Sequence, residues 1–200
     1  MTRAVWDTLL SEARAFHVAN PALKAFCPFP TDIHAQDVTA FDIPAADYLY
    51  REMALQSQNH AALRDAFIAA GPYAKWRETY KGTDIAQDFM DRFCCYCLIG
   101  QGGAFHSNHM AAWVVYMPRG LHYPYHHHPG EEMYAVIAGE AEFFREGETT
   151  EWLGEGATSQ HASNQPHAMT THDSPVMAYV VWRNGFATPP VLTEMAGVEA

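Results

Sequence analysis

Apolar positions in the first hundred residues recur at the spacing of α-helices. Apolar residues between 5 and 16 share one helical face, and Asn20-Pro21 ends that segment. Asn59 is a good N-cap for a later helix that ends at Gly71-Pro72. Two further helical patterns lie around 48–55 and 83–93. We expect these apolar stripes to be faces that pack on the rest of the protein.

The pattern changes after Gly103, where helical spacing gives way to short runs of β-branched and aromatic residues. The runs read AWVVYMP, EMYAVIAG, EAEFFREG, TEWLG and VMAYVVWRNG, and turn residues separate them. Ala138-Gly139-Glu140 predicts a tight hairpin between the second and third runs. Strands of this length with no helices between them predict a small antiparallel barrel or sandwich.

These two patterns predict one folded unit. A chain of 200 residues is long enough for a single domain with a substantial core. We expect a helical N-terminal layer packed on one β-barrel, rather than two independent domains. The expected segments are a mostly helical part at 1–103, the barrel at 104–186 and a C-terminal tail at 187–200 that contains Pro189-Pro190.

Charge excludes several classes of partner. Lys and Arg number 12 against 23 Asp and Glu, for a net charge of −11, which argues against nucleic acid and anionic membrane surfaces. No apolar run approaches the roughly 20 residues of a membrane helix. Asp7, Glu12 and Arg14 interrupt the N-terminal segment, so it does not resemble a signal peptide. We therefore expect a cytoplasmic protein with no nucleic-acid or membrane partner.

The cysteines give only weak evidence of a chemical role. Cys27 stands alone, whereas Cys94, Cys95 and Cys97 crowd into the apolar run FCCYCLIG. That cluster is not a CxxC motif and has no second matching pair. We expect buried thiols that act as small apolar side chains, with a redox or metal role as the alternative.

Histidine carries the strongest chemical signal, because the chain contains 12 of them. On an extended strand, side chains repeat on one face every second residue, so His126 and His128 share a face. Glu132 can rejoin that face after the turn at 129–130, and Tyr134 follows two residues later. Two imidazoles, a carboxylate and a phenol are thus expected to converge.

His167 offers a third imidazole from a later segment. This donor set suits one divalent transition-metal ion, whether Fe, Zn, Mn, Ni or Co, and leaves coordination positions open for a substrate. A triple histidine alone is more often a solvated loop, but here a carboxylate stands at a fixed spacing with a phenol beside it. His127 is expected to point away. The histidines expected to have ordinary surface or hydrogen-bonding roles are His106, His109, His122, His161 and His172.

The same residues resemble the motifs of the cupin family. The first motif, G-x5-H-x-H-x3-E-x6-G, is matched at Gly120, His126, His128, Glu132 and Gly139. The second, G-x5-P-x-G-x2-H-x3-N, is matched in spacing from Gly156 to His167 but departs at Ala162, Asn164 and Thr171. Asn164 can keep the turn, since asparagine tolerates positive φ. The resemblance implies a mainly β protein with a helical N-terminal layer: a jelly-roll-like antiparallel cupin barrel with a metal ion inside.

A narrower resemblance is to the cupin-type dimethylsulfoniopropionate (DMSP) lyases of marine bacteria, in their Q-type branch. It rests on Tyr123-x2-His126-x-His128-x3-Glu132-x-Tyr134, on the mostly helical residues in front and on the later histidine. It implies a carbon–sulfur lyase that cleaves DMSP to dimethyl sulfide and acrylate by metal-dependent β-elimination. The implied ligands are His128, Glu132, His167 and Tyr134, with His126 as a further ligand or close neighbour. Tyr123 and Tyr134 are the candidate bases, and the sequence does not choose between them.

The small-molecule substrate of such an enzyme ends in a sulfonium, which aromatic faces bind by cation–π attraction of roughly 0.5–2 kcal/mol. The candidates for these sulfonium-binding aromatic side chains are Tyr116, Tyr125, Tyr179 and Trp182. Each of them could instead pack in the core of the barrel. Two other functions remain open at this point. One is a different metal-dependent cupin enzyme, such as an Fe(II) dioxygenase, and the other is a non-catalytic cupin that binds a small molecule. No pattern in the sequence defines the oligomeric state.

Overall fold

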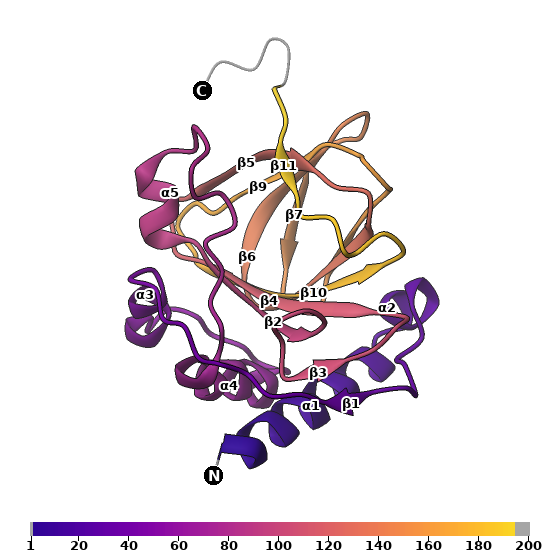
Figure 1. Cartoon of the computed structure of the whole chain (residues 1–200). Helices are drawn as coiled ribbons and strands as arrows, with labels where there is room; N and C mark the ends of the chain where they lie inside the picture. The colour runs from indigo at the N-terminus through magenta and orange to yellow at the C-terminus, as the bar shows by residue number, and fades with distance from the viewer. Residues whose placement is uncertain (1, 195–200) are drawn as a thin grey trace.

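The computed structural model describes residues 2–194 and shows a β structure with most of its helices gathered against one of its faces (Figure 1). The helices follow the apolar stripes of the first hundred residues. They are α1 (Thr2–Ala19), α2 (Pro21–Phe26), α3 (Ala46–Arg51), α4 (Ala61–Ala70) and α5 (Gln87–Arg92), with a 3₁₀ turn at Gly71–Tyr73. Among the described residues, no helix combines the length and apolar character that crossing a bilayer requires.

The expected N-cap of α4 is wrong. The cap residue is His60, and it makes no side-chain capping bond. The carboxylate of Glu155, from the β half, instead accepts hydrogen bonds from the backbone N–H groups of Gln58, Asn59 and His60. A distant carboxylate thus satisfies amides that local capping would have served, and it ties the helical layer to the sheet.

Across the described residues, 2–194, the strands form one eleven-stranded sheet that folds over on itself. They are β1 (His34–Ala35), β2 (Cys94–Ile99), β3 (Phe105–His106), β4 (Ala111–Met117), β5 (His122–His127), β6 (Glu131–Arg145), β7 (Glu151–Gly154), β8 (Thr158–His161), β9 (His167–Thr170), β10 (Val176–Arg183) and β11 (Val191–Leu192). The hydrogen-bonded order is β1-β3-β2-β4-β10-β6-β9-β5-β11, with β7 and β8 also pairing with β6. All pairs are antiparallel except the short contact of β2 with β3. The order does not close into a ring, and the arrangement is the predicted cupin fold.

The expected hairpin at 138–140 is wrong, because β6 continues through it from Glu131 to Arg145. The first half of β6 pairs with β10 and β8, and the second half pairs with β7 and β9. Gly139 lies at the change of partner with φ of 70°, and a Cβ there would lie 1.8 Å from the Pro175 carbonyl oxygen. Glycine therefore lets one long strand bend from one face of the fold to the other.

Strand β2 was not among the predicted strands and lies within 1–103. All six of its residues are buried, and periodicity does not distinguish a short apolar run from a helix segment. Alternation divides its thiols between two cores: Cys94 faces the helices, while Cys95 and Cys97 face the interior of the folded sheet. All are free thiols, and burial raises the pKa of Cys95 to about 12. These facts favour the interpretation as small apolar side chains.

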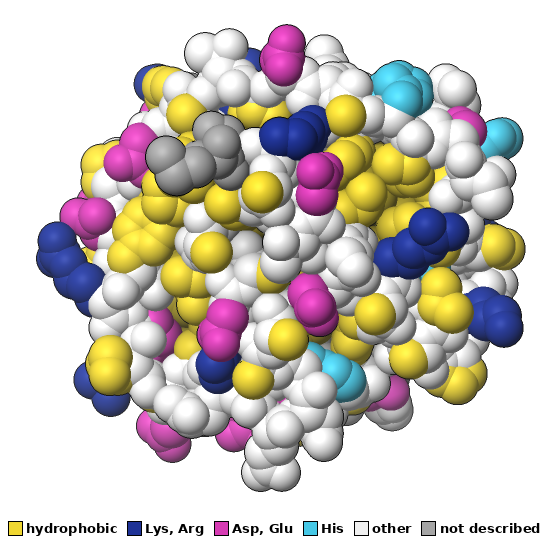
Figure 2. Space-filling model, turned by 90° about the horizontal axis from the view of Figure 1, so that it is seen from below, with side chains coloured by type: hydrophobic (Ala, Val, Ile, Leu, Met, Phe, Trp, Pro, Cys, Tyr) yellow, Lys and Arg dark blue, Asp and Glu magenta, His cyan; other side chains and the backbone are white. Residues whose placement is uncertain are grey.

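The central strands separate two apolar cores. Alternate residues of β4 and β10, Tyr116 and Tyr179 among them, pack against the helices. The intervening residues, including Trp182, face a second core inside the folded sheet together with Tyr123 and Tyr134. One sheet therefore contributes its outer face to the core shared with the helices and its inner face to a second core. Figure 2 shows the helical side, where Lys and Arg side chains are scattered among apolar and acidic ones.

The segment expected as a C-terminal tail includes β11. Its two residues pair with β5, where Val191 lies opposite His127 and Leu192 lies opposite His126. Residues 195–200 of the expected tail lie outside the described residues. This pairing brings residues 191–192 beside the histidine-rich strand, near the top of Figure 1.

Candidate active site

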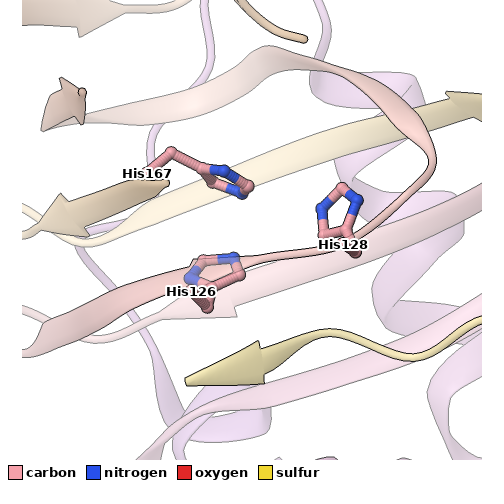
Figure 3. Close-up of side chains that lie close together, drawn as sticks. All are labelled: His126, His128 and His167. Carbon is pink, nitrogen blue, oxygen red and sulfur yellow. The ribbon is translucent and has the colours of Figure 1, made fainter. Parts of the chain in front are cut away.

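Histidines from separate segments meet on the inner face of the folded sheet. His126 comes from β5, His128 follows it, and His167 begins β9 (Figure 3). Each is 2% exposed, and one nitrogen from each ring lies within 4.8 Å of the others. The pairing of β5 with β9 sets His126 directly opposite His167. The predicted convergence of these three side chains is therefore present in the structure.

The proton positions on these rings follow from their partners. In all three histidines, Nδ1 contacts a backbone carbonyl, which can only accept a hydrogen bond, so Nδ1 carries the proton. The acceptors are the carbonyl oxygens of Pro124 at 2.9 Å, Gly130 at 2.9 Å and Gln165 at 2.8 Å. In the neutral rings, Nε2 is then left with a bare lone pair. This is the arrangement that metal-binding histidines adopt.

Glu132 lies among these lone pairs. Its Oε2 is 2.9 Å from Nε2 of His167 and 3.3 Å from Nε2 of His128. Both Nε2 atoms are buried without a hydrogen-bond partner. Lone pairs this close to a carboxylate oxygen repel it unless a cation lies between them. Donors bound about 2.1 Å from one ion lie about 3.0–3.4 Å apart, so the residues present fit a divalent metal ion.

A second group of donors overlaps the first. Glu132, His161 and His167 also bring one ligand atom each within 4.8 Å of one another. Nδ1 of His161 lies 2.8 Å from Oε2 of Glu132. His161 was expected to have an ordinary surface or hydrogen-bonding role. It is hydrogen-bonded, but within the cluster and not at the surface, since its ring is 2% exposed. His127, by contrast, points away as expected and bonds to Thr193.

Charge in this cluster suits a bound cation. Burial acts to raise the pKa of Glu132, but the surrounding histidines, His128 foremost, hold it well below its ordinary value. Burial, with His167 nearby, lowers the pKa of His126 well below 6.5 and that of His161 to about 3. At neutral pH His126 and His161 are therefore neutral imidazoles beside an ionised carboxylate. Those are the protonation states that bind metals.

Both candidate bases lie beside the cluster. Tyr134 is two residues beyond Glu132 in β6, and its ring centroid is 5.4 Å from that of His161. Tyr123 stacks on His126 with centroids 4.0 Å apart, and its hydroxyl lies 2.9 Å from that of Tyr80. Burial raises the pKa of both candidate bases well above 10, and for Tyr134 the Glu132 charge acts in the same direction. Each phenol thus stays protonated unless a positive charge is placed beside it.

A bulge in β5 explains how Tyr123 reaches the cluster. Strict alternation would put Tyr123 and His126 on opposite faces of the strand. The register with β9 shifts between these two residues, so Tyr123 pairs with Met169 and His126 pairs with His167. The extra residue turns Tyr123 to the histidine side. Bulges often re-aim side chains next to active sites.

The four aromatic residues proposed to bind the sulfonium lie on different faces of the sheet. Trp182 reaches the cluster, where it stacks on His128 at 3.8 Å between centroids and donates from Nε1 to Oε1 of Glu132 at 2.5 Å. Tyr116 and Tyr179 belong to the helix-side core, where strand alternation places them. Tyr125 is half-buried near Phe144 and does not line the cavity over the cluster. The structure therefore brings only Trp182 to the site.

A small cavity of about 30 Å³ lies over the cluster, which is room for about one water molecule. Its lining includes Tyr123, Tyr134, Trp113 and Trp182. A hollow of about 790 Å³ shares Arg77, Thr79, Trp113 and Trp182 with it and opens toward solvent. The larger hollow thus adjoins the small cavity through these shared residues.

Sequence reasoning missed four residues at the site. Tyr80 and Arg77 come from the segment before α5, and no motif marks them. Trp113 lies in a predicted strand, but only pairing with β10 sets it beside Trp182, with centroids 4.7 Å apart. His161 can be recognised as a site residue only once β8 is paired with β6, because it then lies opposite Glu132. The pairing of distant strands carries this information.

The fold and this site define a cupin protein whose interior histidine–glutamate group can hold a metal ion. The sequence model of the dimethylsulfoniopropionate lyase family matches residues 22–178. The chain belongs to the DMSP lyase family and is therefore a carbon–sulfur lyase, which confirms the resemblance read from its motifs.

Similar proteins agree along nearly the whole chain. The chain is 50% identical over 196 residues to the dimethylsulfoniopropionate lyase DddQ of Ruegeria pomeroyi, covering 98% of each protein. The crystal structure of DddQ from Ruegeria pomeroyi DSS-3 superposes with a TM-score of 0.94 at 49% identity, covering 98% of this chain and 99% of that one. A structure from work on the DMSP lyases RdDddP and RnDddQII gives 0.92 at 35% identity, covering 97% and 100%.

Proposed function

We propose that this protein cleaves DMSP to dimethyl sulfide and acrylate by a β-elimination that depends on a divalent transition metal, with a tyrosine as base. The observation that carries the proposal is the geometry around Glu132. Nε2 lone pairs of His128 and His167 are directed at its Oε2 in a buried cluster, with Tyr134 and Tyr123 beside it. Membership of the DMSP lyase family supports the substrate.

His128, Glu132 and His167 would hold the ion, with His126 and Tyr134 able to complete its coordination. When bound, a divalent cation draws charge from the substrate carboxylate and lowers the pKa of a nearby phenol. The donor set accommodates Fe, Zn, Mn, Ni or Co.

The base removes the proton on the carbon next to the substrate carboxylate. As that C–H bond breaks, its electron pair forms the carbon–carbon double bond of acrylate, and the C–S pair leaves with neutral dimethyl sulfide. The proton ends on the phenolate oxygen of Tyr134 or Tyr123, both within reach of the cavity. The sulfide is a good leaving group, so proton removal is the step that the site must assist.

The sulfonium end needs an apolar, electron-rich surface that excludes water. Trp182 and Trp113 line the cavity on the side of the larger hollow. Their indole faces can bind a sulfonium by cation–π attraction. The carboxylate end would then point toward the histidines and Glu132, and the reacting carbons would lie near the tyrosines.

The first test measures headspace dimethyl sulfide from purified protein incubated with DMSP. A chelator should abolish release, and the ion that restores it would identify a competent metal. Tyr134→Phe and Tyr123→Phe should separate the two candidate bases, because removing the base should lower kcat by about 10²–10⁴-fold with metal content unchanged.

Tyr116→Phe is the matched control, since Tyr116 is equally buried but bonds to Glu52 on the helix side. It should retain wild-type kcat. A folded, metal-loaded protein that released no sulfide would contradict the proposal. Oxygen consumption with small acids would then test the dioxygenase alternative.

A further inference from the structure

His161 is bonded through both ring nitrogens inside the metal-binding cluster. It ends β8 directly opposite Glu132 on β6, so the two side chains share a face. Its Nδ1 lies 2.8 Å from Oε2 of Glu132, and its Nε2 lies 3.1 Å from the hydroxyl of Ser159. Its ring stacks on that of His167, with centroids 3.9 Å apart.

The partners of His161 assign its hydrogen bonds. An ionised carboxylate only accepts, so Nδ1–H of His161 donates to Glu132. Nε2 is then an acceptor, and the Ser159 hydroxyl donates to it. His126, His128 and His167 show the opposite pattern, with Nδ1 bonded to carbonyls and Nε2 bare. His161 therefore differs in kind from the three histidines whose free lone pairs point into the cluster.

We propose that His161 is a positioning residue for the metal centre, acting through Glu132 rather than as a ligand. Its Nδ1–H holds Oε2, while Nε1–H of Trp182 holds Oε1 at 2.5 Å. The two donors fix the carboxylate plane, so the remaining lone pair of Oε2 faces the Nε2 atoms of His128 and His167. The inference rests on the metal site of the proposed function. Outer donors of this kind tune affinity by orienting the ligands.

A direct-ligand role would require the other tautomer. Nδ1 of His161 would then offer a lone pair to the ion, and Nε2–H would donate to Ser159. A substitution can tell the two roles apart, because the side-chain amide of asparagine places an N–H close to the position of Nδ1. Asparagine can therefore replace the donor to Glu132 but not an imidazole ligand.

The experiment measures Zn²⁺ and Co²⁺ dissociation constants by chelator competition for four proteins: wild type, His161→Ala, His161→Asn and His17→Ala. His17 is the matched control, since it is fully buried with both nitrogens engaged but packs in the helical core. We expect His161→Ala to weaken affinity about 10–100-fold. His161→Asn should recover most of that loss, and His17→Ala should keep wild-type affinity even if its melting temperature falls.

Two results would overturn the inference. Wild-type affinity in a folded His161→Ala variant would show that Glu132 needs no such support. Equal losses in His161→Ala and His161→Asn, with a changed Co²⁺ absorption spectrum, would make His161 a ligand. If the wild-type protein bound neither ion, the proposed metal-dependent function would fail instead, which is a separate result. Should His161→Ala not fold, Ser159→Ala provides the parallel test, since it removes only the donor to Nε2.

Discussion

Trp182 makes two separate contacts at the centre of the site. Its ring stacks on His128, and its indole N–H bonds to Glu132. The hydrogen bond matters for charge, because Oε1 of Glu132 is buried and has no other described donor. A buried carboxylate oxygen without a hydrogen-bond donor costs roughly 1–3 kcal/mol of stability or more. This N–H therefore helps to keep Glu132 ionised and fixed.

Trp182→Phe should therefore preserve the stacking but weaken metal affinity by about tenfold, through loss of the donor to Glu132. Chelator competition with Zn²⁺ measures this change. Trp113→Phe is the matched control, because Trp113 packs on Trp182 and lines the same cavity without bonding to Glu132. Equal affinities for the two variants would contradict this role of the indole N–H.

At the scale of elements, the long strand β6 organises the site. Its first half carries Glu132 and Tyr134 and pairs with β8 and β10, while its second half pairs with β9. The bend between the halves brings β9, and with it His167, over Glu132. The bend depends on Gly139, where positive φ coincides with close approach of the Pro175 carbonyl.

Gly139→Ala should destabilise the protein by at least about 2 kcal/mol, because a Cβ adds left-handed strain and a backbone clash. Thermal or urea unfolding measures the change in free energy. Gly147→Ala is the control: its φ is 80°, but no atom lies within 4 Å of the added Cβ. Gly147→Ala should lower the free energy of unfolding by about 1–2 kcal/mol, which is the cost of left-handed backbone strain alone. Similar losses for both variants would show that the approach of Pro175 is unimportant.

At the scale of the whole molecule, the buried histidines link stability to pH. Burial lowers the folded-state pKa of His17, His122, His126 and His161 below 6.5. Below about pH 6.5 these histidines bind protons in the unfolded chain but stay neutral in the folded chain. The free energy of unfolding therefore falls as pH falls. Glu132 acts in the same direction. Its pKa is lowered in the folded state, so its charge stabilises the fold at higher pH, and this stabilisation is lost in acid.

The metal-free protein should therefore have its full stability above about pH 6.5 and lose it progressively toward pH 4. Urea unfolding at several pH values in the presence of a chelator measures this dependence. His161→Asn should show a shallower decline, because it removes a group whose folded pKa is about 3. A stability that stayed constant between pH 7 and pH 5 would contradict the assignment of these histidines as neutral and buried.

Residues close together in the sequence were predicted well. The first helix, most strands of the β half and the first cupin motif depend on local spacing, and the structure confirms them. Short-range periodicity places His126 and His128 on one face whatever the distant chain does. The strand β2 and the run of β6 through Gly139 were not foreseen, because burial on both faces and a change of pairing partner leave no local signature.

By itself, therefore, the sequence determined the cupin fold, the family and which of the central histidines cluster, because spacing along one strand decides which side chains share a face. Only the tertiary structure decided the rest of the site. Pairing of β8 with β6 set His161 against Glu132, and the bulge in β5 turned Tyr123 onto His126. The two faces of the central sheet separated Trp182 from Tyr116 and Tyr179. Each depends on register and layer packing between distant segments, which local spacing does not encode.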